Sequence, residues 1–250
     1  MTYTKYSASG NDFVIFHTFI KKDYSSLAIE LCNRFDGIGA DGLIALVPHS
    51  KYDFEWLFYN SDGSVANMCG NGTRATAHYA YDNNLVSSND ITFLTGAGAI
   101  NCIVEPQKDA NDIVQTQLTP YIENGIFEEY GQKWLFVDTG VPHFTAIVDD
   151  LNFFDIQMCR DLREKYNTNV NIAKVENSKI YIRTYERGVE DETQACGTGM
   201  ASAFLYAYKQ NLVSNQAFVY PKSGQELTLS IKDNLLYFKG SVKKVFVTNI

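Results

Sequence analysis

The chain has 250 residues, of which 45% are hydrophobic and 20% are charged, and its formal net charge is −8. These are the proportions of a globular protein with a sizeable core, and they exclude general disorder. Lys and Arg form no cluster, so nucleic-acid binding is not expected, and no apolar run approaches the roughly 20 residues that span a membrane. The first ten residues hold no apolar signal-peptide segment, which predicts a cytoplasmic protein.

Short strand-like runs dominate the first half of the chain. One helix-like stretch covers residues 24–35, and a second follows Cys69. The polar segment 105–111, which holds Pro106, is the best candidate for a linker. The runs predicted as strands are 13–16, 43–47, 54–59, 91–95 and 113–118.

The second half of the chain is predicted to contain the same kinds of secondary structure. A helix-like stretch covers residues 155–166, and another follows Cys196. The predicted strands are 134–137, 144–148, 170–175, 180–185, 216–220 and 227–231. The last run, 244–248, has no partner at the end of its own half, and we expect it to return to the first domain. The predicted domains are therefore 1–110, joined by the C-terminal strand 240–250, and 111–239.

The chain contains an internal repeat. The residues from Cys69 are CGNGTRATAHYAY and those from Cys196 are CGTGMASAFLYAY, an offset of 196 − 69 = 127 that is close to half the chain. The preceding helix-like stretches, which start at residues 24 and 155, keep nearly the same offset. Two similar α/β or α+β halves with a cleft between them are therefore expected.

The five cysteines do not indicate disulfides or a metal site. Their number is odd, no secretion signal precedes them, and neither a C-x-x-C nor an H-x-x-x-H spacing occurs. Cys32, Cys102 and Cys159 lie in helix-like or strand-like runs and are predicted to be core residues.

Cys69 and Cys196 differ, because each precedes a Gly-x-Gly and then a helix-like stretch. A thiol at a helix N-terminus has a lowered pKa, and the free N–H groups there can bind a carboxylate or phosphate. Two such thiols could remove an α-hydrogen from one face of a carbon and return a proton to the other, which inverts a stereocentre.

Three alternatives compete with this hypothesis. Duplication of a structural turn with a buried thiol would also produce the pair. The letters from Gly70 to Ala75 match a dinucleotide-binding fingerprint, but the preceding strand ends about ten residues too early. Arg74 after Cys69 suggests a thiol phosphatase loop, but Ala201 stands at the equivalent position of the second copy.

Several motifs together resemble the diaminopimelate epimerase family. They cover nearly the whole chain in the family's order: Ser9-Gly-Asn-Asp-Phe13, Gly37-Ile-Gly-Ala-Asp-Gly42, Asn60-Ser-Asp-Gly-Ser64, Met68-Cys-Gly-Asn-Gly-Thr-Arg74, Thr139-Gly-Val-Pro-His143, Glu186-Arg-Gly188 and Thr193-Gln-Ala-Cys-Gly-Thr-Gly199.

The resemblance implies an α+β fold of two pseudo-symmetric domains, each a β-structure wrapped around a central helix, with the site in the cleft. It implies epimerisation of LL-2,6-diaminopimelate to the meso form, on the bacterial route to lysine and peptidoglycan, without a cofactor or metal. A small-molecule substrate is the implied partner, with no nucleic acid or membrane, and a homodimer is compatible with it.

The family's roles can be carried onto matching positions. Cys196 would be the base toward the LL substrate and Cys69 the acid, with the roles reversed for the meso substrate. His143 and Glu186 would influence the ionisation of the thiols. The residues implied to bind substrate are Asn11, Asn60, Gly70, Asn71, Asn171, Glu186, Arg187, Gly197 and Thr198.

This chain departs from the family pattern mainly in residues expected to recognise the distal end of the substrate. Val141 replaces an asparagine, Gly42 replaces a glutamine of some members, and the segment from Glu186 to Cys196 is one residue longer and acidic. A racemase of another substrate such as a proline derivative, a non-catalytic amino-acid-binding relative and a thiol redox protein therefore remain as alternatives.

Overall fold

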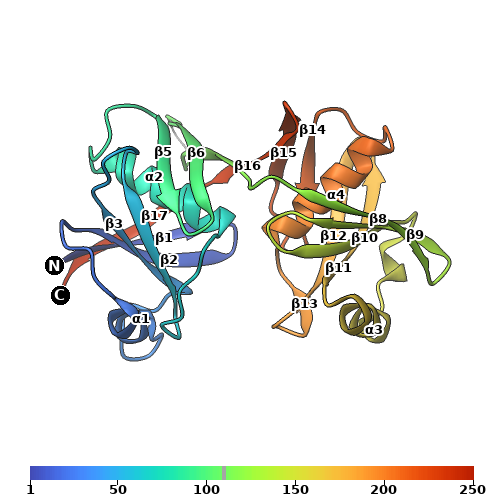
Figure 1. Cartoon of the computed structure of the whole chain (residues 1–250), viewed down its shortest axis with the longest axis horizontal. Helices are drawn as coiled ribbons and strands as arrows, with labels where there is room; N and C mark the ends of the chain where they lie inside the picture. Colours follow the sequence, from blue (N-terminus) through green and yellow to red (C-terminus); the bar gives the residue numbers. More distant parts are fainter. Residues whose placement is uncertain (109–110) are drawn as a thin grey trace. The chain divides into compact units, whose positions relative to one another are not determined.

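The computed structural model describes residues 1–108 and 111–250, and the chain divides into two compact units (Figure 1). The first comprises Met1–Gln117 and Gly240–Ile250, and the second Leu118–Lys239. The division falls after Gln117 and not after residue 110, because β7 (Ile113–Gln117) pairs with β6 (Gly98–Glu105). The expected linker 105–111 joins these two strands, and its residues 109 and 110 lie outside the described residues.

The strands of the first unit pair in the order β17–β1–β2–β3–β4–β5–β6–β7. The pairs β2–β3 and β4–β5 are parallel and the others antiparallel. The C-terminal strand thus lies beside the N-terminal one. The remaining strands are β1 (Thr2–Ala8), β2 (Asn11–His17), β3 (Gly42–Val47), β4 (Glu55–Asn60), β5 (Asp90–Thr95) and β17 (Lys243–Asn249).

The second unit repeats this topology. Its strands pair in the order β8–β9–β10–β11–β12–β14–β15–β16, with β10–β11 and β12–β14 parallel and the others antiparallel. Both units therefore have the same succession of pairings, and the predicted α+β fold with an internal repeat is confirmed. The strands are β8 (Ile122–Glu129), β9 (Gln132–Asp138), β10 (Pro142–Ile147), β11 (Asn169–Glu176), β12 (Lys179–Glu186), β14 (Gln216–Tyr220), β15 (Leu227–Lys232) and β16 (Leu235–Ser241), with the short β13 (Asp191–Thr193) beside β12.

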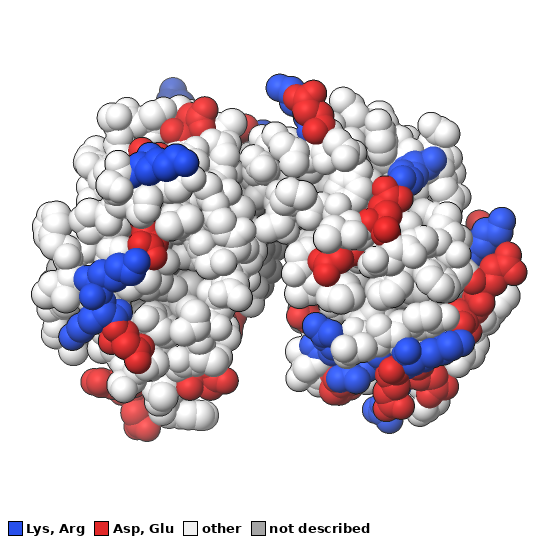
Figure 2. Space-filling view, in the orientation of Figure 1, with Lys and Arg blue, Asp and Glu red and all other residues white. Residues whose placement is uncertain are grey.

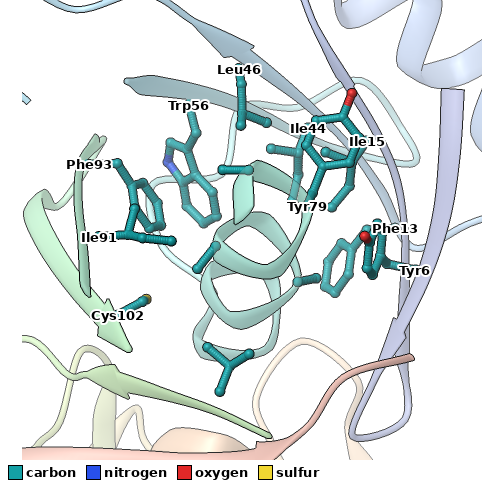
Figure 3. Packing of buried hydrophobic residues seen from close by; sticks show 14 of the residues in the cluster. Tyr6, Phe13, Ile15, Ile44, Leu46, Trp56, Tyr79, Ile91, Phe93 and Cys102 are labelled. Carbon is teal, nitrogen blue, oxygen red and sulfur yellow. The ribbon is translucent and has the colours of Figure 1, made fainter. Parts of the chain in front are cut away.

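A helix of 13 residues lies inside the sheet of each unit: α2 (Gly70–Asp82) and α4 (Gly197–Lys209). Residues 71–80 of α2 and 199–207 of α4 are all buried, as expected of a helix that is surrounded by a sheet. Phe13, Ile15, Ile44 and Trp56 point at α2 from the surrounding strands (Figure 3). The many Ala and Gly residues of both helices let the strands approach closely.

Two outer helices, α1 (Ser25–Cys32) and α3 (Ile156–Tyr166), cover the other side of the sheets, and a single turn of 3₁₀ helix (Leu151–Phe153) precedes α3. The prediction of a helix over 24–35 was too long. The Asn33 side-chain oxygen accepts hydrogen bonds from the N–H groups of Phe35 and Asp36, at 2.8 and 3.0 Å, and so ends α1 in a turn. Cys32, Cys102 and Cys159 are at most 2% exposed, which confirms them as core residues.

No helix of the described residues is long and apolar enough to cross a membrane. On the face shown in Figure 2, basic side chains lie next to acidic ones over each unit. The ion pairs of the described residues include Lys209 with Glu123 at 2.6 Å and Lys244 with Asp82 at 2.7 Å. Exposed pairs of this kind contribute little to stability.

Candidate active site

Cys69 is the N-cap residue of α2. Its backbone is extended, and its Sγ accepts a hydrogen bond from the N–H of Gly72 at 3.4 Å. Burial raises the pKa of the Cys69 thiol, whereas the N–H groups of Gly72 and Asn71 and the charge of Arg74 lower it. The first turn of α2 therefore offers stabilisation to a thiolate at this position.

Cys196 is the N-cap residue of α4, at the equivalent place in the second unit. Its Sγ lies 3.5 Å from the hydroxyl oxygen of Thr198. Burial and, to a smaller extent, the nearby Glu186 carboxylate raise the pKa of this thiol to about 12. The hydroxyl of Thr198 and the N–H groups of Thr198 and Gly199 act in the opposite direction. Each thiol thus has its own helix N-terminus, but their surroundings differ.

Asn11 and Asn71 lie together in the first unit. The Asn71 amide donates to the Asn11 side-chain oxygen at 2.8 Å, and the Asn11 amide donates to Asp41 at 2.9 Å. Asn11 follows a two-residue hairpin turn between β1 and β2, in which Ser9 and Gly10 both have positive φ. The turn therefore places Asn11 beside the first turn of α2, which carries Cys69.

Arg74 supports the same region and is absent from the residues that the sequence predicted for the site. Its side chain is fully buried, and it donates to the Ser9 hydroxyl at 2.7 Å and to the Asn71 side-chain oxygen at 2.6 Å. Burial lowers the pKa of Arg74 to about 10, so the guanidinium stays charged at neutral pH. A single arginine among the mostly small residues of the first two turns of α2 was the sequence signal for this role.

In the second unit, His143 is fully buried between Asn171 and Thr198. Asn171 donates to His143 Nδ1 at 3.0 Å, and His143 Nε2 lies 2.8 Å from the Thr198 hydroxyl. Burial lowers the pKa of His143 to about 3, which makes the imidazole neutral at physiological pH. Asn171 is itself fully buried and also bonds Thr145 and Thr184, both at 2.9 Å. The Asn171 side chain is therefore hydrogen-bonded to other buried residues of the second unit.

The other predicted binding residues lie at or next to the ends of strands and helices. Asn60 ends β4 and donates to the Ser64 hydroxyl at 2.9 Å within its own turn. Glu186 ends β12, where burial raises its pKa. Arg187 donates through its guanidinium to the carbonyl of Asn167 at 2.9 Å. Gly70 and Gly197 are the first residues of α2 and α4.

The departures from the family pattern have structural counterparts. A Cβ at position 42 would lie 2.6 Å from the Phe58 ring and 2.7 Å from the Tyr59 carbonyl oxygen, so β4 leaves room only for glycine there. Val141 is 37% exposed. The acidic residues of the longer loop bond within the second unit: Glu190 pairs with Arg163 at 2.6 Å, and Glu192 pairs with Arg183 at 2.7 Å.

Gly199→Ala is expected to lower the free energy of unfolding by about 1–3 kcal/mol, the usual cost of overpacking. A Cβ at this position would lie 2.6 Å from the Asn171 side-chain oxygen and 3.3 Å from the His143 ring. Gly72→Ala is the matched control, because a Cβ there meets its nearest neighbours at 3.4 Å and alanine favours a helix. Urea unfolding measures both, and equal midpoints for the two variants would contradict this account of Gly199.

Among residues 1–108 and 111–250, no three His, Cys, Asp or Glu side chains are grouped so that they could hold a metal ion. All five cysteines are free thiols.

Solved structures of low sequence identity share this fold. A phenazine biosynthesis protein of the PhzF family from Bacillus anthracis superposes with a TM-score of 0.75 at 12% identity, covering 100% of this chain and 98% of the other. A hydroxyproline epimerase from Agrobacterium vitis gives a TM-score of 0.66 at 13% identity, covering 99% and 91%. The fold is therefore that of the PhzF proteins and the proline-type epimerases.

Sequence comparison identifies one family among the proteins that share this fold. The family model of diaminopimelate epimerase matches residues 3–121 and 135–245. The diaminopimelate epimerase of Nitratiruptor sp. is 56% identical over 99% of this chain and 98% of its own length. That of Campylobacter lari is 52% identical over 98% and 97%. The chain belongs to the diaminopimelate epimerase family, which confirms the resemblance found in its motifs.

Proposed function

We propose that this protein interconverts LL-2,6-diaminopimelate and meso-2,6-diaminopimelate, in the formation of lysine and peptidoglycan precursors. The observation that carries the proposal is the pair of cysteines that N-cap two equivalent 13-residue helices, in a chain that belongs to this family over nearly its whole length. A thiol at a helix N-terminus is suited to exchange a proton with a carbon acid.

The proposed reaction uses the two thiols on opposite faces of one α-carbon. Toward the LL substrate, the Cys196 thiolate removes the α-hydrogen as a proton, so that an S–H bond forms and the C–H electron pair stays on the substrate. The Cys69 thiol then gives its proton to the other face of that carbon and becomes a thiolate. The roles are reversed for the meso substrate, and neither direction consumes an external proton or electron.

Charge develops on the α-carboxylate when the hydrogen leaves, and donors aimed at it lower the barrier. We propose that the N–H groups of Gly70 and Asn71 and of Gly197 and Thr198 supply this stabilisation. They belong to the first turns of α2 and α4, whose N–H groups have no acceptor within the helix.

We propose that the distal end of the substrate, a second amino-acid group, is recognised by Glu186 and Arg187, together with Asn11 and Asn60. A carboxylate and a guanidinium adjacent in sequence can satisfy an ammonium and a carboxylate that share one carbon. A small cyclic amino acid has no such second group, which favours diaminopimelate over a proline derivative.

The test is incubation of the reduced protein with LL-diaminopimelate in heavy water, followed by NMR. Loss of the α-hydrogen signal together with appearance of the meso isomer is the expected result. A protein that binds the substrate without exchanging its α-hydrogen would be a binding relative and not an epimerase, and the proposal would then fail.

We also propose a cytoplasmic homodimer. Val245, Phe246 and Val247 on β17 are 43–53% exposed, at the edge of the first unit's sheet. An apolar edge strand of this kind is a surface on which a second copy can pair. A mass of one chain by light scattering would contradict the dimer, and its recovery outside the cytoplasmic fraction would contradict the location.

A further inference from the structure

The two units differ at four buried strand positions next to the central helix. These positions are polar around α4 in the second unit and apolar around α2 in the first. Strand register defines the correspondence: Asn171 lies between Thr145 and Thr184 in the sheet, as Ile44 lies between Ile15 and Phe58. His143 precedes Thr145 by two residues, as Phe13 precedes Ile15. The polar set is thus His143, Thr145, Asn171 and Thr184, and the apolar set is Phe13, Ile15, Ile44 and Phe58.

The four apolar residues belong to the core around α2, and Figure 3 shows Phe13, Ile15 and Ile44 beside that helix. The topology itself therefore does not need polar groups at these positions. Burying polar groups is costly unless all of them are hydrogen-bonded. In the second unit they are: Thr184 donates to Asn171, Asn171 donates to His143 and Thr145, and the hydroxyl of Thr145 bonds Ser202 at 2.7 Å. Hydrogen-bonded polar residues at these four positions near Cys196, in place of apolar ones at the corresponding positions near Cys69, indicate a function at Cys196.

The hydrogen bonds of this cluster have a direction. Because the Asn171 amide N–H donates to His143 Nδ1, this nitrogen is an acceptor, and the proton of the neutral imidazole is on Nε2. The Nε2–H then donates to the Thr198 hydroxyl oxygen at 2.8 Å. The hydroxyl proton of Thr198 is left to point at its other neighbour, Cys196 Sγ at 3.5 Å.

We propose that the Thr198 hydroxyl donates a hydrogen bond to the Cys196 thiolate, and that His143 and Asn171 are positioning residues that set the direction of this bond. The inference rests on the proposed function, in which Cys196 is one of the two bases. It assigns His143 no proton transfer of its own: the imidazole stays neutral and acts on the sulfur through Thr198.

Two charged groups also act on this cluster. Glu186, at the end of β12, opposes ionisation of Cys196, and Arg187, the next residue, opposes protonation of His143. Within α4 the only basic residue of the last turn is Lys209, at the opposite end from Cys196. The hydrogen bond from Thr198 therefore counteracts the effect of Glu186 on the same thiol.

The test compares Thr198→Val, which removes the hydroxyl at constant shape, with Thr198→Ser, which keeps it. Iodoacetamide reacts with thiolates, and mass spectrometry of the peptides resolves Cys196 from Cys69. At pH 8, we expect Cys196 to be alkylated about tenfold more slowly in Thr198→Val and at nearly the wild-type rate in Thr198→Ser, as for loss of a hydrogen bond to a charged group. Cys69 in the same sample should be unchanged.

Equal alkylation of Cys196 in wild type and Thr198→Val would overturn the proposal. So would equal slowing in both variants, or slowing of Cys69 in the same proportion, since either would indicate altered packing. If Thr198→Val does not fold, ¹⁵N NMR of the wild-type protein can determine the tautomer of His143. A proton on Nδ1 in place of Nε2 would reverse the direction of the hydrogen bonds and overturn the proposal. Both measurements need no substrate, so they are independent of whether diaminopimelate is turned over.

Discussion

Replacement of Cys69 or of Cys196 by alanine is expected to lower the rate of diaminopimelate epimerisation by about 10³-fold or more. In the proposed mechanism each thiol is an acid in one direction and a base in the other, and the loss of one general acid or base typically costs 10²- to 10⁴-fold. Because that mechanism has both groups acting on one carbon, neither variant should retain full turnover in either direction. The rates are measured from both isomers by NMR.

Cys102→Ala is the matched control for these two variants. Cys102 is fully buried in the core around α2, where its sulfur contacts the Thr116 hydroxyl at 3.3 Å. Its replacement should cost some stability through a small cavity but leave the rate per folded molecule close to wild type. Circular dichroism verifies that all three variants are folded. Full activity in Cys69→Ala or Cys196→Ala would contradict the two-thiol mechanism.

The second large effect is on pH dependence: kcat/KM is expected to rise about tenfold per pH unit between pH 6 and pH 8. Burial raises the pKa of both thiols above the ordinary value, to about 12 for Cys196. Below its pKa a thiol is mostly protonated, so the thiolate fraction increases tenfold for each unit of pH. A raised pKa therefore means activity that is gained as pH rises and lost as it falls.

His143 does not contribute to this profile, because its pKa of about 3 keeps it neutral throughout the range. Initial rates at low substrate concentration give kcat/KM, which reports ionisation of the free enzyme. Circular dichroism at each pH separates ionisation from unfolding. A flat profile from pH 6 to pH 8 would show that a thiolate already exists at pH 6, and would contradict the prediction that burial dominates.

The two halves of the molecule share a topology but stabilise their thiols differently. The first unit places the buried charge of Arg74 five residues after Cys69, where the second unit has Ala201. The second unit places a neutral hydrogen-bond chain beneath Cys196, where the first has apolar side chains. The two repeats therefore differ in the groups next to the thiol: a buried charge for Cys69 and a chain of neutral hydrogen bonds for Cys196.

Strand predictions were best where apolar residues are concentrated. The run of β3, which is buried along its whole length, and the alternating runs of β5 and β12 were found. β1 and β8 are among the strands that were not predicted: β1 mixes Thr, Lys and Ser with its tyrosines, and β8 is mostly exposed and holds Gly125. Edge and near-edge strands are held by pairing with neighbours, which a local pattern does not show.

By itself, the sequence determined the repeat, the two helix-capping cysteines and the family, because local motifs and their spacing carry that information. Only the tertiary structure decided that β4 excludes a side chain at Gly42, that Arg74 holds the turn before Asn11, and that Asn171 orients His143. These contacts join residues from different strands and helices. Which residues come into contact depends on strand register and on how the central helix packs inside its sheet. Neither can be predicted from a short segment of the chain.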